Sequence, residues 1–384
     1  MPAQGSVVEL ETSSADVIVV GGGPIGLAVA WRTAQAGLSV IVVDPDPDRG
    51  AWRTAAGMLA PITELHYAES DLLRLNLASA SRYPAFVEEL TALTGLPTGY
   101  HDSGTVEVAW DSADLAALRD LHAFGTGLGL TSTMLSASDL RHLEPGLAAG
   151  LPGGLHAEHD HQVDPRLLHA ALTAATTAAG VRHVRARATV SVTSDRVRAV
   201  QLDDGSLLAT GQVVLAAGAW STQPELGVAD LPAVRPVKGQ TIRLRTDLGS
   251  RHVVRATVKG SPVYVVPREN GEVVVGASSE EAGFDVRPRA GAVYELLRDA
   301  QSVLPVLAEA ELTEVCTGLR PGSPDNAPLL GSFGPDGLIL ATGHYRNGIL
   351  LAPVTADGIA AVLSGAGAPA EIAPFNPSRL AVTA

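Results

Sequence analysis

The arrangement of apolar residues near the start of the chain predicts a strand, a helix and a second strand. Residues 16–20 (DVIVV) and 39–43 (SVIVV) are short β-branched runs of the kind that parallel sheets bury on both faces. Between them, residues 25–36 have apolar side chains at helical spacing and stop before Gly37, a common helix terminator. Two strands joined by a helix usually lie parallel in one sheet with a right-handed crossover, so this segment predicts a parallel sheet.

The middle of the chain mixes helical and strand patterns. Helical spacing extends over residues 72–93, 113–125 and 136–143, and over 165–179 after the N-cap Asp164. Apolar runs and alternation predict strands over residues 106–110, 189–192, 198–202 and 213–216, with the last two joined at Asp204-Gly205. We predict a polar loop over residues 156–162.

The later part of the chain has a different pattern before it returns to the first. Short strands with turn residues between them are predicted over 241–244, 263–266 and 273–275, which indicates an antiparallel sheet. A buried strand over 338–341 and a helix over 353–363 follow. We therefore predict an α/β protein. A Rossmann-like domain with a parallel sheet would comprise residues 1–98, 165–236 and 322–384. An α+β substrate domain with a mainly antiparallel sheet would comprise residues 99–164 and 237–321.

Composition and charge narrow the classes of function. With 46% apolar and 18% charged residues in 384, the chain is typical of a compact enzyme. Its net charge of −14 disfavours nucleic acid and anionic membranes as partners. The single cysteine fits a reducing compartment, and the acidic first 16 residues lack a secretory signal. Glycines and a proline interrupt the longest apolar stretch, so we expect a cytoplasmic protein without a membrane span.

The glycines after the first strand are the first candidate for chemistry. Residues 21–26 (GGGPIG) match G-x-G-x-x-G between a strand and a helix. Gly21 allows the tight turn, Gly23 lets the backbone approach a pyrophosphate, and Gly26 lets helix and strand pack closely. Asp44 ends the second strand, where it would accept hydrogen bonds from a ribose. A glycine-rich turn without a ligand is the alternative for the bare motif, but its context favours a dinucleotide.

Three later features favour FAD over NAD. There is no second glycine fingerprint that would serve a separate nicotinamide domain. Residues 213–220 form a strand that ends in Ala217-Gly218, and residues 343–348 (GHYRNG) form a glycine-bracketed loop that follows a buried strand. Neither a zinc protease motif, a G-x-S-x-G elbow nor a P-loop is found, so hydrolysis and nucleoside triphosphate chemistry have no support.

Five motifs resemble a known family. Residues 54–61 (TAAGMLAP), 235–240 (RPVKGQ), 264–268 (YVVPR), 318–321 (GLRP) and 343–353 are similar to the glycine oxidases of bacterial thiamine biosynthesis. These belong to the D-amino acid oxidase and sarcosine oxidase superfamily, and the resemblance extends from Asp16 to Leu363. It implies non-covalent FAD, oxygen as electron acceptor and a homo-oligomer, commonly a tetramer. The implied reaction is the oxidative deamination of glycine and other small amino acids to glyoxylate, ammonia and hydrogen peroxide.

The same resemblance implies roles for individual residues. Arg320 would clamp the substrate carboxylate, for which a planar guanidinium is well suited. Tyr264 would donate its hydroxyl to the same carboxylate, Arg346 would lie near substrate and ring, and Met58 would lie against the ring. These four are the predicted substrate-binding residues, and the first three the catalytic ones. The predicted cofactor contacts are Gly21, Gly23, Pro24, Ile25, Gly26, Asp44, Ala51, Trp52, Ala56, Gly57, Met58, Val190, Gly218, His344, Tyr345, Arg346, Asn347, Gly348, Ile349 and Leu350.

Alternative roles for these residues, and for the whole chain, stay open. Arg320 could be a surface arginine, and Tyr264 and Met58 could be core residues. His156, His159 and His161 fit a solvated loop better than a metal site, and Cys316 fits a structural thiol better than a covalent flavin link. The rival functions are a broader D-amino acid or sarcosine oxidase, a dehydrogenase that uses a quinone or carrier, and a non-catalytic flavin-binding subunit.

Overall fold

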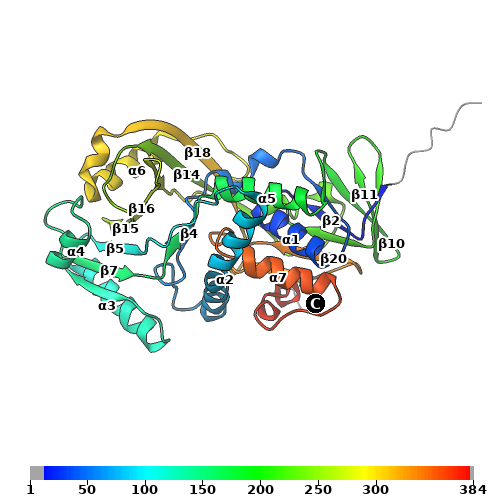
Figure 1. Cartoon of the computed structure of the whole chain (residues 1–384), viewed down its shortest axis with the longest axis horizontal. Helices are drawn as coiled ribbons and strands as arrows, with labels where there is room; N and C mark the ends of the chain where they lie inside the picture. Colours follow the sequence, from blue (N-terminus) through cyan, green and yellow to red (C-terminus); the bar gives the residue numbers. More distant parts are fainter. Residues whose placement is uncertain (1–12, 381–384) are drawn as a thin grey trace, which may run out of the picture.

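Two large β-sheets occupy opposite halves of the molecule in the computed structural model, which describes residues 13–380 (Figure 1). One sheet has six mainly parallel strands, which include the N-terminal strands, and the last helix lies in the same half. The other has eight mainly antiparallel strands. Most of the acidic first 16 residues lie outside the described part of the chain. The mixed α/β architecture predicted from the sequence is confirmed.

The six-stranded sheet assembles three separated segments of the chain in the order β19-β20-β13-β2-β3-β9. All neighbours are parallel except β19 and β20. Every residue of β2, β3 and β20 is buried, as their β-branched and apolar runs predict. The strands are β2 (Val17–Val20), β3 (Val40–Val43), β9 (Arg182–Val184), β13 (Gln212–Leu215), β19 (Leu329–Ser332) and β20 (Leu338–Thr342).

Four helices pack together in the same half. These are α1 (Pro24–Gln35), α2 (Ser70–Thr94), α5 (Pro165–Ala178) and α7 (Ala352–Leu363). Helix α1 packs against both α5 and α7, and α2 packs against α5 and α7. The Asp164 carboxylate caps α5 by accepting from the N–H groups of Arg166 and Leu167, as the sequence predicts. This packing fixes the N-terminus of α1 beside the strand ends.

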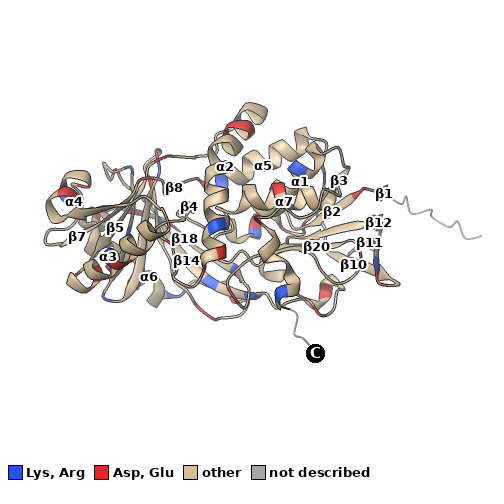
Figure 2. Ribbon diagram, turned by 90° about the horizontal axis from the view of Figure 1, so that it is seen from below, with Lys and Arg blue, Asp and Glu red and all other residues tan. Residues whose placement is uncertain are grey.

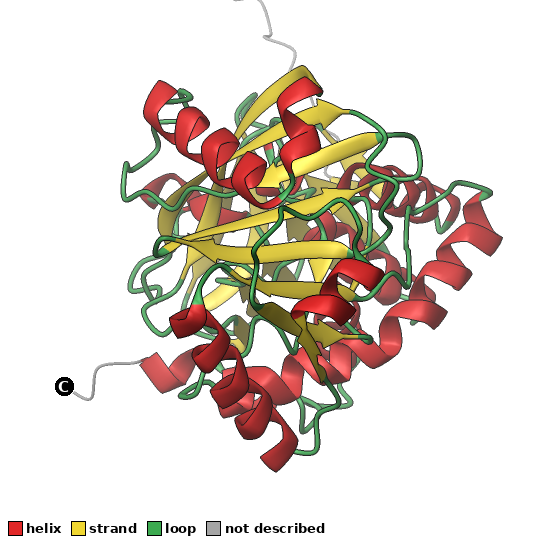
Figure 3. Cartoon of the chain, turned by 90° about the vertical axis from the view of Figure 1, so that its left-hand side faces the viewer, coloured by secondary structure: helices red, strands yellow, loops and turns green. Residues whose placement is uncertain are grey.

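The eight-stranded sheet forms the other half and is seen with its surrounding helices in Figure 3. Its order is β18-β14-β17-β16-β15-β5-β7-β6, and only β15 and β5 are parallel neighbours. Helix α6 (Ala290–Val303) packs on β14 and β16, while α3 (Ser112–Gly127) and α4 (Ala137–Leu143) pack near β5, β6 and β7. The strands are β5 (Thr105–Ala109), β6 (Thr133–Ser136), β7 (Gly153–Ala157), β14 (Arg235–Arg245), β15 (Val253–Val258), β16 (Ser261–Pro267), β17 (Glu272–Gly276) and β18 (Glu311–Gly322).

Two smaller sheets correct the sequence analysis. The turn at Asp204-Gly205 joins β11 to β12, and β13 belongs to another sheet, so the predicted connection is wrong. The predicted loop over residues 156–162 is too long: residues 156–157 belong to β7 and residues 161–162 form β8, which pairs with β4, so that only residues 158–160 form the turn. Partners distant in sequence create these short strands. The remaining strands are β1 (Ser13–Ser14), β4 (Met58–Leu59), β8 (His161–Gln162), β10 (Ala188–Thr193), β11 (Arg196–Leu202) and β12 (Leu207–Ala209).

Acidic and basic residues occur in both halves of the molecule (Figure 2). Blue and red segments are interspersed over both sheets and their helices (Figure 2). Within residues 13–380, no helix is both long and apolar enough to cross a bilayer. Two of the proposed domain boundaries, 236/237 and 321/322, lie within the first and last two residues of the paired strands β14 and β18.

Candidate active site

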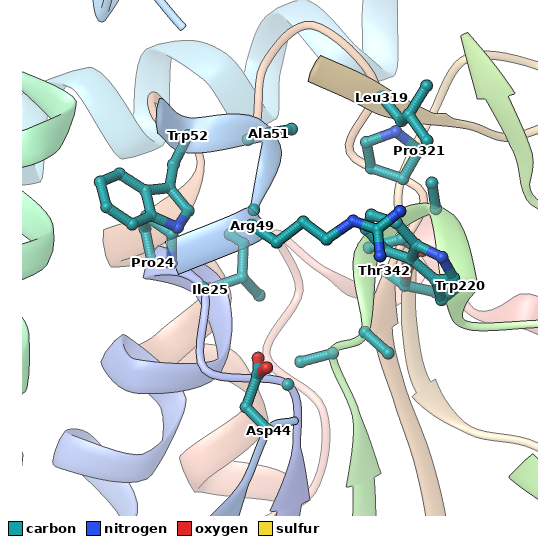
Figure 4. Close-up of a pocket in the computed structure, with 18 of the residues that line it drawn as sticks. Pro24, Ile25, Asp44, Arg49, Ala51, Trp52, Trp220, Leu319, Pro321 and Thr342 are labelled. Carbon is teal, nitrogen blue, oxygen red and sulfur yellow. Dashed lines mark hydrogen bonds between the residues drawn. The ribbon is translucent and has the colours of Figure 1, made fainter. Parts of the chain in front are cut away.

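A cavity of about 1030 Å³ lies where the two sheets meet, and Figure 4 shows part of its lining. The ends of β2, β3 and β13 contribute to its wall, and β14, β16 and β18 contribute from the antiparallel sheet. Small-molecule sites commonly have volumes up to about 1,000 Å³, so this cavity can hold a large ligand. It also lies at the carboxyl ends of parallel strands, where α/β proteins bind ligands.

The glycine turn between β2 and α1 has the geometry that a dinucleotide requires. Gly21 has a φ of +116°, and a Cβ there would lie 2.6 Å from the Ala216 carbonyl carbon. A Cβ on Gly26 would overlap the Gly21 carbonyl oxygen. The N-cap residue Gly23 supplies no side-chain cap, and the first turn of α1 has no acidic residue. The N–H groups of Gly23 and Ile25, two residues that line the cavity, are therefore available to a pyrophosphate.

Asp44 lies at the end of β3, on the wall of the same cavity. Its Oδ2 accepts from the Gly22 N–H at 2.6 Å, and its Oδ1 accepts from the Asp46 N–H at 2.8 Å. Each carboxylate oxygen keeps a free lone pair, so the fixed carboxylate can accept hydrogen bonds from ribose hydroxyls. Residues 185–189 line the neighbouring stretch of wall.

The segment after Asp44 is coupled to the glycine turn by stacked rings. Trp52, in a short 3-10 helix over Ala51–Arg53, stacks on His169 with ring centroids 3.9 Å apart. His169 Nε2 lies 2.9 Å from the Gly22 carbonyl oxygen. Burial lowers the pKa of His169, which keeps this ring neutral near pH 7. The pair thus fixes residues 51–58 relative to the N-terminus of α1.

The loop that follows β20 closes another side of the cavity. Helix α2 holds it from behind, because the Tyr83 hydroxyl donates to the Ile349 carbonyl at 2.9 Å and the Ser79 hydroxyl donates to the Leu350 carbonyl at 2.6 Å. His344 Nε2 lies 3.0 Å from the Thr355 hydroxyl. Complete burial lowers the pKa of His344 to about 3. His344 is therefore a neutral, fixed part of the wall.

Arg320 and Tyr264 lie on the antiparallel sheet, and glycines on neighbouring strands make room for both. A Cβ on Gly239 would lie 2.6 Å from Arg320 Cζ, and one on Gly276 would lie 2.5 Å from Tyr264 Cζ. The guanidinium and the phenol are thus packed closely over bare backbone. Arg320 Nη1 also donates to the Ser278 carbonyl at 3.1 Å. Both side chains line the cavity.

The electrostatics of this wall keep Tyr264 protonated. Burial raises the pKa of Tyr264 above its usual value, and the charge of Glu64 raises it further, while Arg320 opposes both. A protonated phenol can donate a hydrogen bond to an anionic ligand. Arg320 and Tyr264 together therefore offer donors for a carboxylate.

A charged trio that the sequence analysis missed lies beside them. Glu64 lines the cavity, and its Oε1 accepts from Arg255 Nη1 at 2.8 Å. Arg255 Nε donates to Glu107 Oε2 at 2.9 Å, and Arg255 Nη1 lies 3.8 Å from Met58 Sδ. The three members lie far apart in the sequence on different elements. No local motif could have revealed them.

The structure brings most of the predicted site residues together. The cavity is lined by Gly21, Gly23, Pro24, Ile25, Asp44, Ala51, Trp52, Ala56, Gly57, Met58, Gly218, Tyr264, Arg320, His344, Tyr345, Arg346, Gly348 and Ile349. It is not lined by Gly26, Val190, Asn347 or Leu350. Gly26 supports the turn from behind, and Ala188 and Thr189 occupy the wall near Val190. The Asn347 N–H donates a hydrogen bond to the His344 carbonyl at 2.9 Å, and the Leu350 carbonyl accepts one from Ser79 of α2.

Arg346 and Arg49 mark two edges of the cavity. The Arg346 guanidinium is exposed, lies 5.4 Å from the Tyr345 ring and donates to His66 Nε2 at 2.6 Å. Arg49 was not predicted, yet it extends across the cavity toward Trp220, with its guanidinium carbon 5.4 Å from that ring (Figure 4). A cation that is placed opposite the α1 N-terminus adds to the attraction for a pyrophosphate. Nothing in the local sequence separates Arg49 from other surface arginines.

The residues weighed as metal ligands or covalent attachment points lie elsewhere. In the range 13–380, no three His, Cys, Asp or Glu residues are grouped so that they could hold a metal ion. Cys316 is buried on β18 beside Arg166 and Glu314 and does not line the cavity. Burial raises the pKa of its thiol. These positions favour a structural role for Cys316.

The glycine turn, the open α1 terminus and the fixed Asp44 fit FAD, and the wall opposite offers donors for an anionic substrate. The chain belongs to the family of FAD dependent oxidoreductases, whose model matches residues 16–362. FAD is therefore its cofactor.

Individual relatives narrow the comparison within that family. The chain is 33% identical over 368 residues to a glycine oxidase of Geobacillus kaustophilus, which covers 95% of this chain and 97% of that protein. The crystal structure of glycine oxidase from Geobacillus kaustophilus superposes with a TM-score of 0.88 at 32% identity, over 96% of this chain and 99% of that chain. A bifunctional protein ThiO/ThiG of Synechocystis sp. is 37% identical over 382 residues and covers 97% of this chain. This chain spans about half of that bifunctional relative, 55% of its length.

Proposed function

We propose that this protein is a glycine oxidase. The reaction is glycine + O₂ + H₂O → glyoxylate + NH₃ + H₂O₂. The observation that carries the proposal is the position of Arg320 and Tyr264 on the cavity wall opposite the dinucleotide turn. The similarity to glycine oxidases over nearly the whole chain supports the same substrate.

The parallel half of the cavity holds the cofactor in this proposal. The α1 N-terminus and Arg49 face the pyrophosphate, Asp44 accepts from the ribose, and the segments 56–58 and 343–349 enclose the ring. Bound FAD supplies the two-electron acceptor that receives a hydride from the substrate α-carbon and returns both electrons to oxygen. Non-covalent attachment agrees with the position of Cys316 outside the cavity.

The antiparallel half binds and orients the substrate. Arg320 pairs with the carboxylate through two parallel N–H groups, and the Tyr264 hydroxyl donates to the same group. Glu64 offers an acceptor to the substrate amino group, and Met58 closes the wall near the α-carbon. Arg346 covers the cavity edge. These residues fix the Cα–H bond relative to the ring, so positioning supplies most of the catalysis, and no side-chain base is needed to remove a carbon-bound proton.

Anaerobic mixing with a panel of amines tests the function. Purified protein is mixed without oxygen with glycine, sarcosine or D-alanine, the yellow colour is followed, and air is then admitted. The proposal predicts that glycine bleaches the colour, and that air restores it with one peroxide per glyoxylate. Faster bleaching by D-alanine or sarcosine would indicate a broader oxidase. Bleaching that air does not reverse would indicate a dehydrogenase, and no bleaching by any amine would indicate a non-catalytic subunit.

The wider biological setting is also part of the proposal. We place the enzyme in thiamine biosynthesis and in the cytoplasm. We also propose that it forms a homo-oligomer, and the family that it resembles commonly forms tetramers. The family resemblance supports the pathway and the assembly, and the single cysteine suits a reducing compartment. Sedimentation of the purified protein would measure the assembly directly.

A further inference from the structure

Side-chain donors surround the backbone of residues 53–56, of which Thr54, Ala55 and Ala56 line the cavity. Arg166 donates to the Arg53 carbonyl from Nε at 3.2 Å and Nη2 at 3.1 Å, and Thr241 donates its hydroxyl to the Thr54 carbonyl at 2.9 Å. Arg268 Nη2 donates to the Ala56 carbonyl. The carbonyl groups of Arg53, Thr54 and Ala56 therefore point toward protein side chains.

The peptide between Ala56 and Gly57 can donate a hydrogen bond to a ligand in the cavity. It is a trans peptide, so its N–H points opposite to the Ala56 carbonyl. Both residues line the cavity, whereas Arg268 does not. The Gly57 N–H therefore points to the cavity side, and among residues 13–380 it has no protein acceptor. Arg268 polarises this peptide and places a positive charge directly behind it.

The charge of Arg268 is less compensated than that of its neighbours. Arg166 has a carboxylate partner, Glu314, at 2.9 Å, and the nearly inaccessible Arg243 is paired with Glu272. Arg268 is only 6% exposed, and it donates to two neutral oxygens, those of Ala56 and of Gln162 at 2.6 Å.

The nearest carboxylate of Arg268 belongs to Asp164. Its Oδ2 lies 3.9 Å from Arg268 Nε, and its Oδ1 is occupied in capping α5. Burial lowers the pKa of Arg268 to about 10, so it remains a cation at neutral pH. A buried, weakly compensated cation acts strongly on nearby charge.

We propose that Arg268 is a positioning residue that tunes the flavin: through the Ala56–Gly57 peptide it directs an N–H group and a positive charge toward the ring and thereby raises its electron affinity. Reduction by two electrons adds negative charge to the ring system, and a cation that is held in place before the reaction stabilises that charge without reorganisation. The inference rests on FAD binding and deepens the proposed oxidase function, because a more electron-poor ring takes a hydride more readily.

Sulfite affinity and reduction potential test this without any amino acid present. Sulfite is an anion that adds to flavin N5 and leaves negative charge on the ring, so it reports the same electron affinity. Arg268→Gln keeps an N–H donor for the Ala56 carbonyl and removes the charge. We expect FAD to stay bound, sulfite to bind at least tenfold more weakly and the two-electron potential to fall by at least 30 mV, the equivalent of a tenfold change. Arg166→Gln is the matched control, since this partly exposed guanidinium binds the Arg53 carbonyl, which does not line the cavity, and it should change sulfite affinity less than threefold.

A second variant changes the charge balance in the opposite direction. Asp164→Asn keeps an N-cap for α5 and removes the carboxylate closest to Arg268. It should tighten sulfite binding severalfold and raise the potential. Unchanged sulfite affinity and potential in Arg268→Gln would overturn the proposal. If Arg268→Gln loses FAD, the decision passes to Asp164→Asn, in which unchanged or weaker sulfite binding would overturn it. Normal glycine oxidation alongside either result would leave the proposed function intact.

Discussion

The two walls of the cavity recognise their ligands by different means. The wall from the parallel sheet uses mainly backbone: the glycine turn, the N-terminus of α1 and the loop after β20, held by helix packing. The wall from the antiparallel sheet uses half-buried ionisable side chains, Arg320 and Tyr264, which are set close over the bare backbone of neighbouring glycines. A backbone site tolerates little change of geometry, whereas a side-chain site responds to changes of charge and donor number. Substitutions in each wall separate these two sensitivities.

The largest effect is expected from Gly21→Ala in the parallel wall. The new Cβ would lie 2.6 Å from the Ala216 carbonyl carbon at a φ of +116°, so the turn must shift away from the pyrophosphate. We expect protein purified without bound FAD and without oxidase activity, measured by absorbance and peroxide release. Gly37→Ala is the control, because its φ of +88° is also positive but nothing lies within 4 Å of the new Cβ. Equal FAD content in both variants would contradict the assignment of the turn.

Arg320→Ala should have the next largest effect and a different character. Removal of one partner of a charge pair commonly costs about 2–5 kcal/mol, and a cost of about 3 to 4 kcal/mol would lower kcat/KM for glycine about 10²- to 10³-fold. The protein should stay yellow, because Arg320 lies on the wall opposite the glycine turn. Steady-state kinetics together with the flavin spectrum measure both properties. Near-normal kinetics of this variant would show that Arg320 does not bind the substrate carboxylate.

Gly239→Ala tests the same group without deleting it. The added Cβ would lie 2.6 Å from Arg320 Cζ, so the guanidinium must move. A displacement of about 1 Å can cost about 10²-fold in rate, and we expect a loss of that order in kcat/KM with FAD retained. Gly291→Ala, where nothing lies within 4 Å of the new Cβ, serves as the control and should keep wild-type kinetics. Unaltered turnover in Gly239→Ala would mean that the guanidinium does not need this position.

Tyr264→Phe should have a smaller effect on the same wall. It removes one hydroxyl donor to a charged acceptor, a contribution of about 1.5 kcal/mol or more, so kcat/KM should fall about tenfold. Because Arg320 remains, the loss should be well below that of Arg320→Ala. Kinetics of both single variants and the double variant would measure their coupling. A Tyr264→Phe loss as large as that of Arg320→Ala would assign the main role to the phenol.

The smallest expected effect concerns pH and the parallel wall. The pKa of His344 is lowered to about 3 in the folded chain, against roughly 6.5 in the unfolded chain, so the unfolded state binds the extra proton between these values. The resulting stability is present above pH 6.5 and is lost as pH falls toward 3, by about 2 kcal/mol between pH 7 and pH 5. His344→Gln should reduce the acid-induced loss of Tm by about 2 to 3 °C. His142→Gln, at an exposed position of α4, should retain the wild-type slope.

The contrast between the walls also explains what could be predicted from the sequence. The β2–α1–β3 unit was predicted correctly because its strands, glycines and Asp44 are consecutive, and each acts through local backbone geometry. Asp164 capping α5 was predicted for the same reason. Strands β4 and β8 were missed, because two-residue strands exist only through pairing between distant segments.

Only some of the residues in the antiparallel wall could be predicted from the sequence. The resemblance to a family pointed to Arg320 and Tyr264, which line the cavity, but it gave no sign of Glu64 or of the Arg255 and Glu107 side chains behind it. Arg268 belongs to the YVVPR motif, which implied no role for it. Its surroundings come from the segment before β4, from β8 and from the start of α5, and these approach one another only in the complete fold.

Binding of a substrate-like carboxylate is the most direct test of the account, because it requires both walls at once. Glycolate has the carboxylate of glycine and a hydroxyl in place of the amino group, and it can be titrated into oxidised holoenzyme while the flavin spectrum is followed. We predict a saturable spectral change in the wild-type protein and at least a hundredfold higher Kd in Arg320→Ala. Equal affinity in the two proteins, or the absence of any flavin response in the wild type, would contradict a guanidinium that presents a carboxylate to the bound flavin.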